Sequence, residues 1–461
     1  MGVVTKKTNG LFMDLKLRMF YVANAPMADG FRRKELLSLS DEDFENKHGF
    51  IQWAFPTTEP KKHLSNAPVL DLGSAIWLAK NHEVSEFLES MTVRFLEFLK
   101  SNPHWKCKYN HNHLRISRAI QSIRILHSWE LASWFYNKVK DLAGDSLSQM
   151  ENSNRYWAYY ASPIHDRIAG AFVGLAIGDA LGAPVEFLPR GTFDTVTSYG
   201  AGEHFKLPAG AWTDDTAMAI CLAQNIIEND GLAIDDLLNK FCDWAEHGSN
   251  TSTGVAVGIG QNTLRVLGDY RRNGYLEALP FGSKNDGNGS LMRLAPIACH
   301  AYSDVELARS LASNQSKATH ASRPAEQSCQ LLAEILCMLI SGHDMNSAIK
   351  ASTQRDWGQA VRSILSRNLA NESSEDVTAS GYVIETLHAA LWSVTNSKDF
   401  KSATLKAVNL GDDANTVGAI AGQIAGAIYG YSSIPKDLKT GLINERELYV
   451  TSQLIARSSK I

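Results

Sequence analysis

Apolar residues recur three or four positions apart along most of the chain, which is the pattern of helices that bury one face. In the N-terminal part this spacing runs through residues 84–98 and through "HLRISRAIQSIRILHSW", where Ile116, Ile120 and Ile123 share one face. From about residue 163 the apolar segments become rich in Ala and Gly, as in "IAGAFVGLAIGDALGAPVEF" and "TVGAIAGQIAGAIYG". The pattern predicts an all-α protein whose C-terminal helices pack closely through small residues.

The chain has 461 residues, which is long for a single core and predicts more than one domain. The change of texture places a smaller helical domain at 1–140 and a larger one at 163–461. Between them, "DLAGDSLSQMENSNRYW" (141–157) is polar, so residues 141–162 are predicted to be a linker.

Composition and charge narrow the class of protein. The chain is 44% hydrophobic and 20% charged, with a net charge of −4, so nothing in it favours nucleic acid or a membrane surface as a partner. Its six cysteines form no CxxC pair, which indicates reduced thiols and a cytoplasmic location. Asp14, Lys16 and Arg18 interrupt the apolar segment "GLFMDLKLRMF", so neither a signal peptide nor a transmembrane helix is predicted.

Two short motifs about 200 residues apart repeat one arrangement: "WTDDTAMA" (212–219) and "GDDANTVGA" (411–419). Each places acids and a threonine where a helix begins. For "TDDT" alone, capping is the simpler explanation, because Thr213 or Asp214 can accept hydrogen bonds from the first N–H groups of a helix. The second copy adds Asp413 and Thr416, and hard oxygen ligands from two helices suit Mg²⁺ or Mn²⁺.

Three further segments carry weaker signals. "GLAIGDALGAPVEF" (174–187) contains Glu186, a carboxylate that could face a bound sugar. In "DGNGSLMRLAPI" (286–297) a loop of small residues, Gly287–Ser290, is predicted to run into a helix and could present N–H groups to phosphate. "THASRP" (319–324) places His320 near a helix start. Taken singly, such a loop is more often a turn and such a histidine more often structural.

In this order the five segments resemble the signature segments of the ADP-ribosylglycohydrolases, the group that includes dinitrogenase reductase-activating glycohydrolase. The resemblance covers about 163–432. It implies a compact all-α fold that holds two Mg²⁺ ions, with Mn²⁺ as an alternative. The implied reaction is hydrolysis of the bond between ADP-ribose and a protein side chain, often an arginine guanidinium.

The resemblance also implies roles for individual residues. Glu186 would lie near the scissile ribose, and either Glu186 or Asp214 could transfer the proton. Divalent ions would activate water and fix the ribose hydroxyls. The ADP-ribose pocket would be lined by Gly287, Asn288, Gly289, Ser290 and His320. The metal ligands would be Thr213, Asp214, Asp215, Asp413, Asn415 and Thr416.

Asn415 departs from the family pattern, which usually has aspartate at this position. Asparagine keeps an oxygen that can bind a metal but removes one negative charge, leaving Asp214, Asp215 and Asp413 to face two divalent ions. We expect weaker binding of at least one ion. A slower hydrolase, a one-metal hydrolase, and a protein that keeps the pocket without turnover all remain open.

The N-terminal domain has its own resemblance. "FIQWAFPTTEP", "NAPVL" and "HNHLRISRAIQSIRIL" are similar to the conserved domain of opioid growth factor receptor over about 40–139. The cluster of histidines and a cysteine in "HWKCKYNHNH" lacks the spacing of a zinc finger, so a zinc site is disfavoured. Arg115, Arg118 and Arg124 are predicted to form a solvated basic face that could meet an acidic partner.

Two functions from different classes follow. The first is a hydrolase that removes ADP-ribose from modified proteins. The second is a catalytically weak or inactive protein that acts as a partner-binding or inhibitor module. An immunity protein that also binds an ADP-ribosyltransferase toxin through its N-terminal domain would combine the two.

Overall fold

The computed structural model describes residues 15–27, 30–59, 67–202, 204–282 and 285–456, and these contain helices and no β-strand. The predicted all-α class is confirmed. The first residues of "GLFMDLKLRMF", including Asp14, lie outside the described residues. The chain divides into two compact units, Met1–His165 with Ser458–Ile461, and Asp166–Arg457. Each unit is described by itself.

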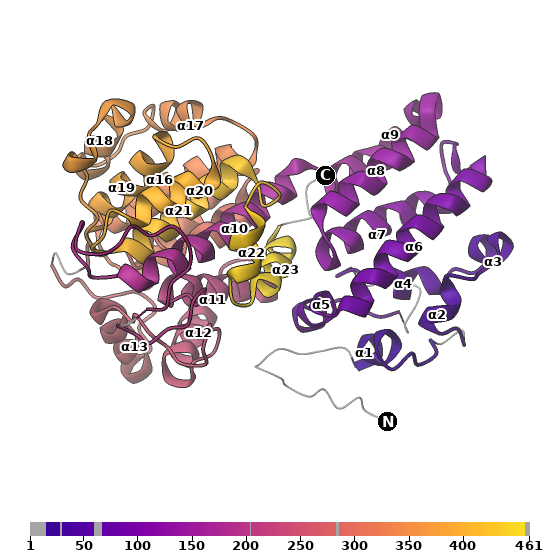
Figure 1. Ribbon diagram of the computed structural model, residues 1–461, viewed down its shortest axis with the longest axis horizontal. Coiled ribbons are helices and arrows are strands. Elements are labelled where there is room, and N and C mark those ends of the chain that lie inside the picture. Colours follow the sequence, from indigo (N-terminus) through magenta and orange to yellow (C-terminus); the bar gives the residue numbers. More distant parts are fainter. Residues whose placement is uncertain (1–14, 28–29, 60–66, 203, 283–284, 457–461) are drawn as a thin grey trace. The chain divides into compact units, whose positions relative to one another are not determined.

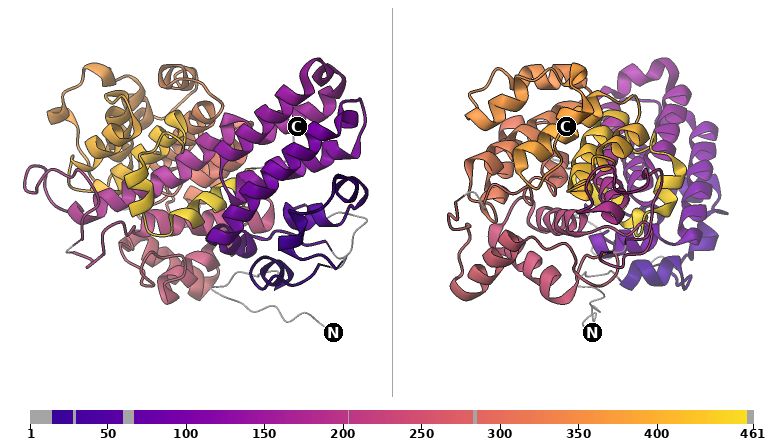
Figure 2. Two further views of the ribbon diagram at one scale, coloured as in Figure 1. Left: turned by 45° about the vertical axis from the view of Figure 1, so that its right-hand side comes forward. Right: turned by 60° about the vertical axis from the view of Figure 1, so that its left-hand side comes forward.

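The N-terminal unit is built around four helices, α6 to α9, which Figure 2 (left) shows in purple and which lie side by side. Its core is aromatic: the ring of Phe44 lies 4.8 Å from that of Phe50 and 4.6 Å from that of Phe98. The helices of this unit are α1 (Leu15–Tyr21), α2 (Arg33–Leu36), α3 (Asp41–Asn46), α4 (Phe50–Ala54), α5 (Leu72–Ala79), α6 (His82–Ser101), α7 (His111–Leu126), α8 (Trp129–Ala143) and α9 (Glu151–Tyr160), with 3₁₀ turns η1 (Pro103–Trp105) and η2 (Gly144–Met150).

The segment predicted as a linker, 141–162, is instead helical. It contains the end of α8, the 3₁₀ turn η2 and helix α9. Trp157 of α9 is fully buried, and its Nε1 donates to the carbonyl oxygen of His113 at 3.1 Å. Met150 and Tyr160 are buried as well, so a few large apolar side chains outweigh the polar residues around them, and Trp157 docks α9 on α7.

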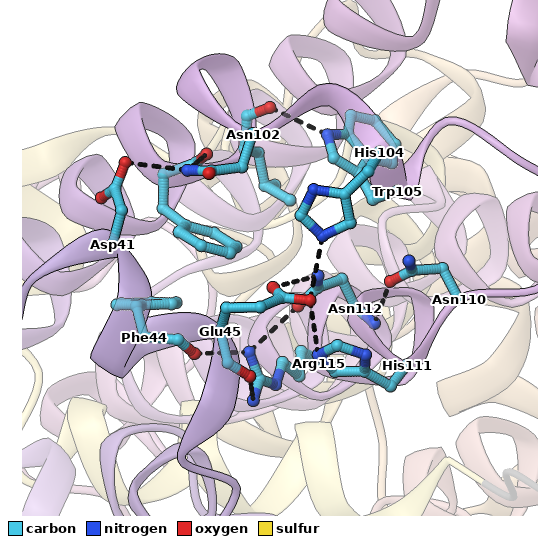
Figure 3. A network of polar contacts seen from close by, with 12 residues as sticks. Asp41, Phe44, Glu45, Asn102, His104, Trp105, Asn110, His111, Asn112 and Arg115 are labelled. Carbon is cyan, nitrogen blue, oxygen red and sulfur yellow. Dashed lines mark hydrogen bonds and ion pairs between the residues drawn. The ribbon is translucent and has the colours of Figure 1, made fainter.

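The predicted basic face of α7 is also wrong, because Arg115 and Arg124 are buried. The guanidinium of Arg115 donates to the backbone carbonyl oxygens of Phe44 at 2.7 Å and Lys47 at 2.9 Å. Figure 3 shows this side chain directed at helix α3. Burial lowers the pKa of Arg115 to about 10, and Glu45 opposes this shift. The planar donor set of arginine satisfies carbonyl groups that end a short helix.

The histidines and the cysteine near α7 contact other groups of the protein. The Nε2 atoms of His104 and His111 lie 2.9 Å and 3.4 Å from Oε1 of Glu45 (Figure 3). His113 is buried, and its Nε2 lies 2.8 Å from the carbonyl oxygen of Trp105. Cys107 donates to the carbonyl oxygen of His104. Each of these side chains is thus accounted for by a hydrogen bond or an ion pair.

The C-terminal unit gathers its helices around α21, which packs against α16, α19 and α20 (Figure 1). Helix α10 (Pro163–Gly182) begins in the first unit and continues into the second. The remaining elements of this unit are η3 (Ala183–Val185), α11 (Asp214–Asn229), α12 (Ile234–His247), α13 (Gln261–Asn273), α14 (Ala295–Ala301), α15 (Val305–Lys317), α16 (Arg323–Ile340), α17 (Met345–Ser352), α18 (Gln359–Leu365), η4 (Leu369–Asn371), η5 (Ser374–Asp376), α19 (Val383–Thr395), α20 (Phe400–Val408), α21 (Ala414–Tyr429), α22 (Lys436–Gly441) and α23 (Glu445–Ile455).

Two global features bear on the sequence-based expectations. All six cysteines are free thiols, and five of them are buried. By length and composition, one helical stretch of the described residues, Trp129–Val185, could cross a bilayer, and 94% of its most apolar window is buried inside the protein. Such burial is also what a core helix of a packed domain shows.

Candidate active site

Helices α10 and α21 touch backbone to backbone, and this contact brings the predicted motifs together. A Cβ atom built at Gly178 would lie 1.9 Å from the carbonyl oxygen of Gly418, and one at Gly182 would lie 2.4 Å from the backbone nitrogen of Asn415. Only glycine permits so close an approach. The facing residues form a glycine ladder: Gly170, Gly174 and Gly178 of α10 against Gly426, Gly422 and Gly418 of α21. The end of α10 is thereby fixed at the start of α21.

The start of α11 is capped by a residue from another helix. Thr213 occupies the N-cap position, but its side chain makes no capping hydrogen bond. Asp179 of α10 takes that role: its carboxylate accepts from the backbone N–H groups of Thr213 and Thr216 at 3.0 and 3.1 Å. Its oxygens also accept from the hydroxyls of Thr213 at 2.7 Å and Thr216 at 2.6 Å. Asp179 therefore caps α11 in place of the predicted Thr213 or Asp214.

Asn415 joins the two motifs. Its Nδ2 atom donates to Oγ1 of Thr213 at 3.1 Å and to Oδ2 of Asp215 at 3.2 Å. These bonds span about 200 positions of sequence, so the two predicted half-sites do meet. The amide that replaces the usual aspartate therefore acts as a hydrogen-bond donor between a hydroxyl and a buried carboxylate.

Asp413 ends the loop before α21 and is held from the side. Nδ2 of Asn288 donates to Oδ2 of Asp413 at 2.7 Å and to Oγ1 of Thr386 at 3.0 Å. Burial raises the pKa of Asp413, while hydrogen bonds from Asn288 and Thr416 lower it. Asn288, predicted to line a ligand pocket, thus also positions a carboxylate.

Glu186 is buried and directly follows η3, the 3₁₀ turn after α10. Its Oε2 atom has no hydrogen-bond partner. Burial, followed by the negative charges of Asp413 and Asp179, raises the pKa of Glu186 to about 8. The carboxyl group therefore faces the same space as the two motifs.

The electrostatics of the site are dominated by carboxylates. Burial is the largest cause that raises the pKa values of Asp214 and Asp215 well above their usual range, and neighbouring carboxylates raise them further. Arg293 is a fully buried cation whose charge acts on Asp214, but its own N–H groups are bonded to Gln315 and Thr319. Negative charge that is gathered and buried in this way favours a cation as a ligand.

The loop Gly287–Ser290 meets His320 as predicted from the sequence. A Cβ atom built at Gly289 would lie 2.9 Å from Cε1 of His320, so the imidazole packs directly on the loop. Burial, and then the charge of Arg293, lowers the pKa of His320 to about 3, which keeps the ring neutral. Its Nδ1 lies 2.9 Å from Oγ1 of Thr319.

Two details of this loop differ from the prediction. The loop does not run directly into a helix, because α14 begins at Ala295 after a series of turns. Ser290 is fully buried, and its hydroxyl lies 2.9 Å from that of Ser316. Its side chain therefore packs inside the protein, and the binding of phosphate by the N–H groups of the loop stays a prediction.

Whether these residues fit a divalent metal can be tested on their oxygen atoms. Three buried oxygens have no hydrogen-bond partner: Oε2 of Glu186, Oδ1 of Asp215 and Oδ1 of Asn415. A buried oxygen without a partner is costly unless a cation or a donor reaches it. Among the described residues no group of three or more His, Cys, Asp or Glu side chains could hold a metal ion alone. The donor chemistry fits Mg²⁺ or Mn²⁺ provided that Thr and Asn oxygens take part.

Sequence analysis missed two neighbours of the site. Asp179 lies inside the apolar helix α10 and is fully buried. A lone acid among small apolar residues was the sequence signal, because a buried carboxylate needs hydrogen-bond partners of its own. Gly258 was not singled out, yet a Cβ atom there would lie 2.3 Å from Oδ1 of Asp214. Its positive φ of 77° and this close approach both require glycine.

The unit is all-α and collects buried carboxyl groups at the starts of two helices beside a glycine loop, which is the kind of cluster expected of an enzyme active site. Residues 161–460 match the family model described as ADP-ribosylglycohydrolase. Since this match covers more than half of the sequence, the chain belongs to the ADP-ribosylglycohydrolase family.

Individual relatives agree with this assignment. ADP-ribosylarginine hydrolase Tri1 of Serratia proteamaculans (strain 568) is 40% identical over 288 residues, covering 61% of this chain and 77% of the relative. The ADP-ribosyl-dinitrogen reductase glycohydrolase of Rhodospirillum rubrum is 30% identical over 280 residues, covering 59% of this chain and 88% of the relative. A solved structure described as an ADP-ribosylglycohydrolase-related protein complex has a TM-score of 0.56 at 34% identity and covers 63% of this chain and 97% of its own.

Proposed function

We propose that this chain removes ADP-ribose from arginine side chains of modified proteins and that a divalent cation is required. The observation that carries the proposal is the set of unpartnered buried oxygens of Glu186, Asp215 and Asn415, gathered where two family motifs meet. Arginine as the acceptor is supported by two relatives, 40% and 38% identical, that are named ADP-ribosylarginine hydrolases.

The cation would be held at the starts of α11 and α21. When bound, Mg²⁺ or Mn²⁺ would supply Lewis-acid chemistry to oxygen atoms at the reacting sugar. Asp179 and Asn288 would act indirectly, because they hold Thr213 and Asp413 in place. The residues that would bind the cation are Thr213, Asp214, Asp215, Asp413, Asn415 and Thr416.

Hydrolysis breaks the bond between the anomeric carbon of ribose and a guanidine nitrogen. The hydroxyl of water joins the carbon, and the remaining proton of water goes to the nitrogen, so one carboxyl group must relay a proton. Oε2 of Glu186 has no hydrogen-bond partner and is free to hold that proton. Asp214 is the other candidate for this role.

The direct test is Mg²⁺-dependent release of ADP-ribose from an arginine-ADP-ribosylated protein. We expect the native chain to release ADP-ribose, EDTA to stop it and Asp214→Ala to abolish it. The matched control is Asp243→Ala, which removes an exposed acid of α12 and should leave release unchanged. Full activity of Asp214→Ala would refute the assigned metal site.

A second function is favoured by the separate N-terminal unit and by Asn415. In this case the chain binds an ADP-ribosyltransferase toxin through residues 15–165 and so acts as an immunity protein. The Asp214→Ala variant, which cannot reverse the modification, should then still inhibit the transferase in a purified assay. If the native chain releases no ADP-ribose, yet both proteins inhibit the transferase, the binding function stands alone. A transferase that stays fully active beside the Asp214→Ala variant would exclude the binding function.

A further inference from the structure

Phe187 has an unusual backbone conformation directly beside the site. Its φ is +65°, in the left-handed region where a bulky side chain is disfavoured and glycine is not. The conformation is held by two reciprocal hydrogen bonds: the N–H of Phe187 donates to the carbonyl oxygen of Asp412 at 2.7 Å, and the N–H of Asp412 donates to that of Leu188 at 2.8 Å. Asp412 itself has a φ of +53°.

These bonds join the segment that follows Glu186 to the segment that precedes Asp413. Glu186 precedes Phe187, and Asp413 follows the residue to which Phe187 is bonded. Although Glu186 is buried and Asp413 half-buried, 60% of Phe187 is exposed. The ring therefore lies at the surface, on a segment that is bonded through its backbone to the segment of Asp413.

The ring is supported by other aromatic side chains. Its centroid lies 5.3 Å from that of His204 at an interplanar angle of 76°, and 6.5 Å from that of Phe205 at 70°. His204 and Phe205 are themselves in edge contact at 4.5 Å. Edge-to-face packing orients an aromatic ring while leaving much of it accessible.

An exposed phenyl ring at a position that glycine would occupy without strain needs a reason. Backbone strain of this kind persists where the surrounding structure enforces it, and it concentrates at ligand contacts. Burial cannot be the reason here, because the ring is mostly exposed. A contact that forms only when a ligand is bound can explain the strained backbone.

We propose that the ring of Phe187 stacks on the guanidinium group of the acceptor arginine. This inference rests on the proposed function and names the residue that recognises the acceptor. A guanidinium ion is attracted to the face of an aromatic ring, and the planar guanidinium of arginine stacks well on such a face. The adenine base is the competing occupant, because it also stacks on aromatic rings. Phe187 directly follows Glu186, which the proposed function assigns to the scissile bond, and this favours the acceptor over the adenine base.

Phe187→Gly tests the contact without adding strain, because glycine accepts the positive φ. We expect the KM for ADP-ribosyl-arginine to rise roughly twofold to fivefold, the range of an accessible cation–π contact. The inhibition constant of free ADP-ribose should stay unchanged, because this product lacks the guanidinium. Phe187→Tyr keeps the ring and should restore the native KM. Leu188→Ala, at the next exposed apolar residue, is the matched control and should behave like the native chain.

Two results would overturn the inference. An equal weakening of ADP-ribose and ADP-ribosyl-arginine would show that the ring contacts ADP-ribose itself. An unchanged KM for Phe187→Gly would show that the ring contacts neither. If the native chain has no turnover, the proposed function fails, and calorimetric binding of the same two ligands to the native chain and Phe187→Gly decides the contact by the same criteria.

Discussion

Asn415→Asp would restore the usual acid of the family at a point where the structure uses an amide donor. Nδ2 of Asn415 lies 3.2 Å from Oδ2 of Asp215 and 3.1 Å from Oγ1 of Thr213. Aspartate would lose both donated hydrogen bonds and bring a second negative charge against Asp215. We therefore expect the metal-free variant to be less stable than the native chain.

The size of this effect follows from the geometry. Two unit charges at the observed 3.2 Å would repel by about 5 kcal/mol at an effective dielectric constant of 20, which is an upper bound because burial raises the pKa of Asp215. The new carboxyl group can instead bind a proton, which at pH 7 limits the penalty to about 4 kcal/mol for an ordinary aspartate. We expect a loss of about 2 to 4 kcal/mol in EDTA, which corresponds to a fall in Tm of roughly 3 to 7 °C for a unit the size of Asp166–Arg457.

Mg²⁺ should reverse this loss, because the added carboxylate then faces a cation. In thermal unfolding, the rise in Tm from EDTA to saturating Mg²⁺ should be larger for Asn415→Asp than for the native chain, and Mg²⁺ affinity by calorimetry should be higher. Asn415→Ala is the control, since it removes the amide without adding charge and should gain no metal response. Equal Tm values in EDTA, with equal Mg²⁺ shifts, would refute the charge argument.

Three further substitutions test the packing inside each unit. Asp179→Ala removes the cap of α11 and leaves buried N–H and hydroxyl groups unpaired, so we expect about 2 to 4 kcal/mol of destabilisation in urea unfolding; a loss under about 0.5 kcal/mol would contradict this capping role. Gly178→Ala drives a methyl group onto the carbonyl oxygen of Gly418 and should cost about 1 to 3 kcal/mol, whereas unchanged stability would mean that the helices separate freely. Arg115→Lys cannot supply the same set of donors to α3, so the N-terminal unit should lose about 1 to 3 kcal/mol, measured by hydrogen exchange of α7, while Mg²⁺-dependent release of ADP-ribose stays native; unchanged exchange would mean that these bonds add nothing.

The fold class and the two helix starts that carry acids and a threonine could be predicted from the sequence because their signals are local. The helical spacing of apolar residues can be recognised without knowing which helix packs against them. The motifs "TDDT" and "DDANT" each predict a helix start from a few neighbouring residues. His320 and the loop at Gly289 were placed in one pocket only through the order of the family motifs, and the structure puts them in contact. Their spacing in the sequence alone gives no such pairing.

The remaining features depend on tertiary contacts. Asp179 caps a helix that begins 35 residues later in the chain, since α11 starts at Asp214, so no local window contains both partners. Arg115 looked solvated because the carbonyl groups that bury it come from α3, about 70 positions earlier. Trp157 lies in a polar segment, and its hydrogen-bond partner, His113, lies more than 40 positions earlier in the chain. In each case the missing information was a distant partner.

The glycine ladder between α10 and α21 also governs which incorrect structures are possible. Its glycines recur every four residues on both helices, and a helix rises about 1.5 Å per residue. The next alignment in which glycine again faces glycine is therefore displaced by about 6 Å, and smaller displacements drive side chains into backbone. The separation between Glu186 and the start of α21 can consequently change only in large discrete steps. A misaligned chain would be a distinct folding species rather than a slightly distorted enzyme, and it would have to unpack the two helices before it could correct itself.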